Sequence, residues 1–251
     1  MNRFGSVWLP VLATLFVAQA SHAMSKQQKL QVDVLVLDAT MTLAKMGAAG
    51  GRFAAKEMSP GWEEMPQGTP NADTVYVAKV SSAADRAALA YCPTCDALKG
   101  VSKENYKGFE RFIPFATQIN GHQIAREAAN SLAQSRHPDT WGPDLLWNLT
   151  TEAARAAIKR GESEEEIGRA AAKVAWDYVI NKSSQIGDAV RGQVDSNYLA
   201  DKFDANQVLT SLKKSMDSDE FKQGLPEAQN FYKASVAKLE QKMKHQHLIA
   251  P

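Results

Sequence analysis

The sequence of 251 residues contains little cysteine, with only Cys92 and Cys95, two residues apart. Covalent attachment of a c-type haem needs a histidine directly after the second cysteine, and Asp96 stands there instead, so this cofactor is excluded. A zinc site needs further ligands, and no second pair of cysteines or histidines follows at finger-like spacing. We therefore predict neither a metal nor a cofactor.

The sequence also lacks an excess of charge of one sign. It has 29 basic and 28 acidic residues, which gives no electrostatic attraction toward nucleic acid or an anionic membrane. Beyond the N-terminus no apolar run approaches the roughly 20 residues of a membrane-spanning helix, so we expect a soluble mature protein. Walker, Gly-x-Ser-x-Gly and His-Glu-x-x-His motifs do not occur, nor does an internal repeat.

Residues 1–23 have the order of a secretory signal peptide. Arg3 precedes an apolar run over 7–18, and small residues follow, with cleavage expected after Ala20 or Ala23. No cysteine stands at either site, which argues against a lipoprotein. We expect a periplasmic or secreted protein; the alternative is an uncleaved leader that tethers the chain to the inner membrane.

The segment after the leader combines two conflicting patterns. Ser25 and Gln28 have the spacing of a capping box, and the apolar residues of 30–44 recur at helical spacing. Alternating valines in the same stretch favour a strand instead. We predict a helix here and keep the strand as the alternative.

Glycine and proline are concentrated in residues 47–73, which predicts a long irregular connection. The next stretch, 74–80 with the sequence TVYVAKV, is the best strand candidate in the chain. Ser82 followed by Asp85 is typical of a helix start, and this helix would run into Cys92.

From about residue 115 onward the sequence is consistently helical. Apolar residues recur on one face over 119–132, and four local signals mark helix ends: Gly161 as a stop, and the Ser163/Glu166 capping box, the Asp204/Gln207 pair and Pro226 as starts. We therefore predict a mainly α fold: an irregular domain of about five to seven helices with Gly/Pro-rich loops and at most a minor strand element.

The predicted organisation has three parts. Residues 1–23 form the signal peptide. Residues 24–73 form an N-terminal helix and an irregular connection, and residues 74–251 form a helical domain that contains the loop between Cys92 and Cys95.

We predict that Cys92 and Cys95 form a structural disulfide, because exported thiols oxidise and no other cysteine is available. The alternative is a thioredoxin-type redox centre. That centre needs a strand before the first cysteine, whereas an alanine-rich, helix-like run precedes Cys92.

Four other residues are candidates for function. Trp62 and Trp141 lie in Gly/Pro-rich stretches, where an exposed tryptophan can anchor a partner. His122 and His137 could act as acid or base in a hydrolase. We favour a non-catalytic exported protein that acts through protein contacts. A component or accessory of a cell-envelope assembly is one candidate for such a role. The alternative is a periplasmic enzyme, a thiol oxidoreductase or a hydrolase.

Overall fold

The computed structural model describes residues 24–63, 70–89, 143–193 and 203–250, together with Tyr91, Pro93 and Leu199. The leader, both cysteines, the predicted helix over 119–132, and the candidates His122, His137 and Trp141 lie outside these residues. The helices are α1 (Lys26–Ala48), α2 (Gly50–Glu57), the 3-10 helix η1 (Pro60–Glu63), α3 (Ala72–Ala87), α6 (Pro143–Lys159), α7 (Glu164–Asn181), α8 (Ser183–Gln193), α9 (Ala205–Ser215), α10 (Asp219–Gln223) and α11 (Pro226–His245).

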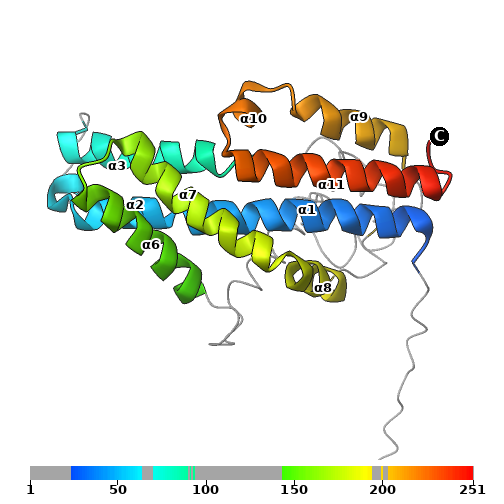
Figure 1. Ribbon diagram of the computed structural model, residues 1–251, viewed down its shortest axis with the longest axis horizontal. Helices are drawn as coiled ribbons and strands as arrows, with labels where there is room; N and C mark the ends of the chain where they lie inside the picture. Colours follow the sequence, from blue (N-terminus) through cyan, green and yellow to red (C-terminus); the bar gives the residue numbers. More distant parts are fainter. Residues whose placement is uncertain are drawn as a thin grey trace, which may run out of the picture.

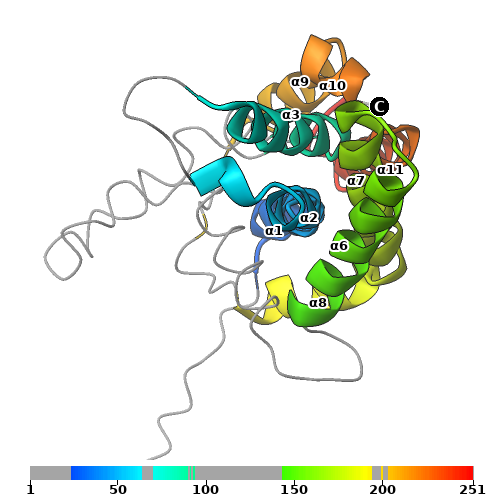
Figure 2. The ribbon, with the colours of Figure 1, turned by 90° about the vertical axis from the view of Figure 1, so that its left-hand side faces the viewer.

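The prediction of a mainly α, multi-helix fold is confirmed, and the described ranges contain no strand. Helices α1 and α11 lie side by side, and α9 packs on α11 (Figure 1). Seen from the end, α1 and α2 lie in the middle, beside α3, α7, α6 and α8 (Figure 2). No helix among the described residues is long and apolar enough to cross a membrane.

Helix α1 is the central helix of the fold. The Ser25 side chain accepts a hydrogen bond from the Gln28 N–H, and the Gln28 side chain accepts one from the Ser25 N–H, so the predicted capping box is formed. Leu30, Gln31 and Val32 are consecutive and all buried, although successive residues of a helix point about 100° apart. Because α1 is covered on several sides, its sequence has no strong amphipathic pattern, which explains the ambiguity between helix and strand.

The strand predicted over 74–80 is wrong, because these residues belong to α3. The Asn71 side chain caps this helix by accepting a hydrogen bond from the Thr74 N–H at 2.8 Å. Residues 77, 80, 84 and 87 are buried at helical spacing, and α3 packs closely on α7. Burial of this face outweighs the strand preference of β-branched residues. The helix start predicted at Ser82 is also wrong, since Ser82 lies inside α3.

The irregular connection predicted over 47–73 is wrong in part, because it contains α2 and η1. Two glycines begin α2, and Gly50 packs against α6. A Cβ atom at Gly50 would lie 2.1 Å from the Thr150 Oγ1 and 2.8 Å from the Thr151 N. These glycines therefore allow two helix backbones to approach closely rather than interrupting the helix.

The helix ends predicted in the C-terminal half are confirmed. Gly161 follows α6 with a φ of 73°, in the left-handed region that glycine adopts without strain. The Ser163/Glu166 capping box starts α7, and the Asp204 side chain caps α9. Pro226 is in the first turn of α11, where its missing N–H breaks no hydrogen bond.

Candidate functional site

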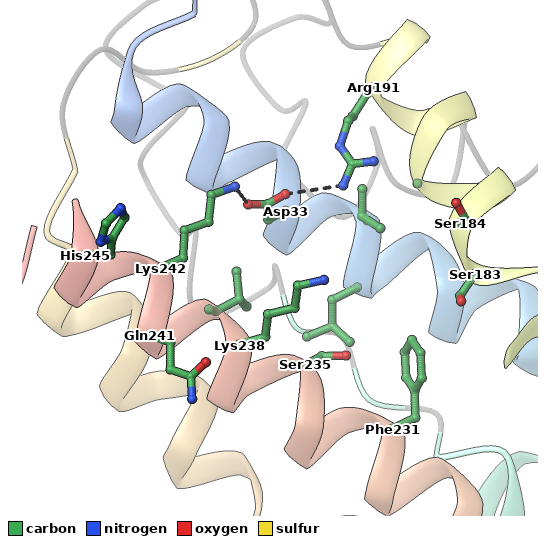
Figure 3. A pocket seen from close by; sticks show the side chains of 14 residues that line it. Asp33, Ser183, Ser184, Arg191, Phe231, Ser235, Lys238, Gln241, Lys242 and His245 are labelled. Atoms are coloured by element: carbon green, nitrogen blue, oxygen red, sulfur yellow. Dashed lines mark hydrogen bonds and ion pairs between the residues drawn. The ribbon is translucent and has the colours of Figure 1, made fainter.

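A groove with a volume of about 800 Å³ lies between α8 and α11, with α1 as its floor (Figure 3). Both α8 and α11 pack on α1. We call it the basic groove, and the residues that line it are Asp33, Val36 and Leu37 of α1, Ser183, Ser184, Gly187 and Arg191 of α8, and Phe231, Ser235, Lys238, Leu239, Gln241, Lys242 and His245 of α11.

Three cationic side chains and one carboxylate set the charge of the basic groove. Lys242 donates a hydrogen bond to Oδ2 of Asp33 from one side, and Nη2 of Arg191 lies 3.6 Å from Oδ1 from the other (Figure 3). Within the described part of the chain Lys238 forms no ion pair. The lining residues therefore carry more positive than negative charge, and Lys238 is the cation that no acid of the groove neutralises.

Helical periodicity places these side chains on the groove. On α11, Phe231, Ser235, Lys238 and Lys242 follow one another at intervals of four, three and four residues, so they share one face of the helix. On the other wall, α8 begins directly after Lys182, whose carbonyl accepts the Ile186 N–H. Helices α8 and α11 therefore form the two walls of the groove.

The centre of the groove is apolar. Leu37 and Leu239 are buried, while Val36 and Phe231 are half-buried. The Phe231 ring also packs against Trp176, with 5.5 Å between ring centroids. The groove therefore offers an apolar surface next to its charges, and the hydroxyl groups of its three serines add hydrogen-bond donors.

The neighbouring face of α11 carries a buried polar cluster. The Tyr232 hydroxyl is 2.8 Å from the Ser215 Oγ and donates to the Leu212 carbonyl at 3.2 Å. Burial is the largest cause that raises the pKa of Tyr232, so this side chain stays protonated at neutral pH. Because Tyr232 is fully buried, it packs α11 against the core and does not face a ligand.

The chemistry available in the groove is recognition of an anion. Arginine and lysine bind carboxylate and phosphate groups, arginine in a bidentate manner and lysine as a point charge. Among the described residues, no group of three or more histidine, cysteine or acidic side chains is arranged to hold a metal ion.

The one predicted site residue that the structure describes, Trp62, does not line the groove and packs against a different core cluster. The Lys56 Nζ is 3.4 Å from the centroid of its ring, and the Thr74 hydroxyl donates to its carbonyl at 3.0 Å. Trp62 is half-buried between α2 and α3. Whether it also contacts a partner stays a prediction, as do the roles of Trp141, Cys92 and Cys95.

Reasoning from the sequence missed the basic groove. On α11 the apolar residues 232, 236, 239 and 243 form the buried stripe, and the groove lies on the neighbouring face. The spacing of Lys238 and Lys242 was a usable signal on that face. Nothing in the sequence indicated that Asp33 would lie beside Lys242, which is 209 positions away.

Comparison with known proteins gives no relative. The sequence matches no protein-family model, and no curated protein or solved structure is significantly similar to it.

Proposed function

We propose that the protein is an exported, non-catalytic binding protein that acts through contact with a protein partner in the cell envelope, and that the basic groove is its contact surface. Export rests on the leader-like order of residues 1–23. The observation that carries the binding role is the convergence of Arg191, Lys238 and Lys242 on a groove that holds a single carboxylate, Asp33.

The physical argument is one of charge complementarity. Cationic side chains around an apolar centre attract a partner of opposite charge, speed its encounter and reject partners that are themselves basic. The apolar residues supply contact area once the charges have aligned the two molecules. This distribution of charged and apolar residues suits recognition of a partner surface.

The test is affinity capture from envelope extracts with wild-type protein and with Lys238→Glu, which reverses the charge of one exposed residue and removes the net positive charge of the groove. Lys214→Glu is the matched control, because Lys214 is also exposed on a helix but lies on α9, outside the groove. Circular dichroism checks that both variants fold.

We expect at least one envelope protein to be captured by wild type and by Lys214→Glu but lost with Lys238→Glu, and to bind again when both proteins are pure. Capture that is the same for all three proteins would rule out the groove as the contact surface. The intact mass of the exported protein tests the leader: it should correspond to a chain that starts at Ser21 or Met24.

A further inference from the structure

The shape of the basic groove indicates an elongated ligand. Its α11 wall runs from Phe231 to His245, which corresponds to about 21 Å at the rise of an α-helix. A single small anion would contact one end and leave the apolar floor uncovered. The apolar centre of the groove, with Val36 of α1 and Leu239 of α11, favours a ligand that carries apolar groups as well as negative charge.

The charges are distributed along the groove rather than gathered at one point. Lys238 and Lys242 are one turn apart on α11, about 6 Å along its axis, and Arg191 lies on the opposite wall. A fatty acid carries one anionic group at one end and could satisfy one of these positions. Two acidic residues four positions apart on a helix have the same spacing of about 6 Å as the two lysines.

Asp33 already lies where an acidic group of a ligand would bind. It is flanked by Lys242 and Arg191, and 18% of its side-chain surface remains exposed. Asp33 therefore keeps two of the three cations aligned across the groove and competes with any incoming carboxylate for them. Lys238, which has no such competitor in the described residues, is the first cation that a ligand can pair with.

We infer that the partner segment which binds in the basic groove is an acidic amphipathic helix: its apolar stripe packs on Val36, Phe231 and Leu239, and its carboxylates pair first with Lys238 and then compete with Asp33 for Lys242 and Arg191. This inference rests on the proposed function and adds the chemistry of the partner. Binding of a helix in a groove between helices is a common mode of peptide recognition.

The test uses a fluorescent, helix-forming peptide of about 14 residues, the length that matches the groove. Leucines recur on one face at i, i+3, i+4 and i+7, and glutamates flank them in pairs four residues apart. The control peptide has glutamine in place of every glutamate. Fluorescence anisotropy measures the Kd of both peptides, and oleate and inorganic phosphate are titrated separately as competitors.

We expect the acidic peptide to bind more tightly than its glutamine version, and more weakly as the salt concentration rises. Lys238→Gln should weaken binding about two- to fivefold, the effect of an exposed ion pair, while Lys214→Gln, on α9, should leave it unchanged. Asp33→Asn should tighten binding about two- to fivefold, because it removes the carboxylate that pairs with Lys242. Arg191 keeps its second partner, Asp188, whose Oδ1 lies 3.4 Å from Nη1. If Asp33→Asn does not fold, the two lysine variants decide the question.

Equal binding of the two peptides, or equal effects of the two lysine variants, would overturn the inference. So would tight binding of oleate or phosphate to a groove that does not bind the acidic peptide. The proposed function is tested separately. A captured partner that depends on Lys238 supports it even if the acidic peptide does not bind, and binding of the peptide without such a partner contradicts it.

Discussion

Gly168 of α7 lies where α7 crosses α3, and its lack of a side chain allows the two helices to approach closely. A Cβ atom at this position would lie 2.5 Å from the Ala84 N, 2.6 Å from the Ala83 Cβ and 2.8 Å from the Ala83 carbonyl carbon. Two of these three atoms belong to the backbone and cannot rotate away. Gly168→Ala must therefore push α3 and α7 apart.

Two opposing effects set the size of the change. Replacing glycine by alanine inside a helix stabilises it by about 1 kcal/mol, while overpacking a tight interface costs about 1–3 kcal/mol. Because the clash at Gly168 is with backbone, we take the upper end of that range. The expected result is a net loss of about 2 kcal/mol in the free energy of unfolding.

The chain offers a matched control in Gly192 of α8, where a Cβ atom would meet no atom within 4 Å. Gly192→Ala should stabilise the protein by about 0.4–1 kcal/mol, because it only lowers the entropy of the unfolded chain. Urea unfolding followed by circular dichroism measures both variants. If Gly168→Ala is as stable as wild type or more stable, the α3–α7 interface is not as tight as described.

Three further predictions concern pH and the cysteine pair. Burial raises the pKa of Tyr232 above its ordinary value of 10.0, so the stability that this group contributes is present below pH 10.0 and is lost as the pH rises toward the folded-state pKa. In alkaline solution the variant Tyr232→Phe should not show this loss of stability. At neutral pH the variant should be about 0.5–1.5 kcal/mol less stable than wild type. The hydrogen bond from Lys173, followed by one from the Glu227 backbone, lowers the pKa of Glu227 below 4.5. The stability that Glu227 contributes is therefore present above pH 4.5 and is lost as the pH falls through the folded-state pKa. The difference in urea midpoint between wild type and Lys173→Gln should vanish in acid, and a difference that persists there would contradict this direction of the pH dependence. Cys92 and Cys95 should resist alkylation until a reductant is added, as shown by intact mass, and the protein should not reduce a model disulfide; free thiols in the freshly exported protein, or turnover that the double serine variant lacks, would favour the oxidoreductase alternative.

The sequence alone determined where four of the described helices begin, α1, α7, α9 and α11, and where α6 ends. The capping boxes at Ser25 and Ser163, the cap at Asp204 and the proline at 226 all act within one turn of the chain. Interactions between residues so close in sequence form in the same way whatever the rest of the fold does. For that reason the mainly α class and several helix starts could be predicted without a structure.

Tertiary structure decided what local patterns left open or misjudged. Residues 74–80 have strand-like composition, and they are helical because α3 buries one face against α7. The basic groove exists because α1, α8 and α11 meet, which brings Asp33 beside Arg191 and Lys242. No pattern in a single sequence encodes which distant helices will touch, since that depends on how all the buried faces pack together.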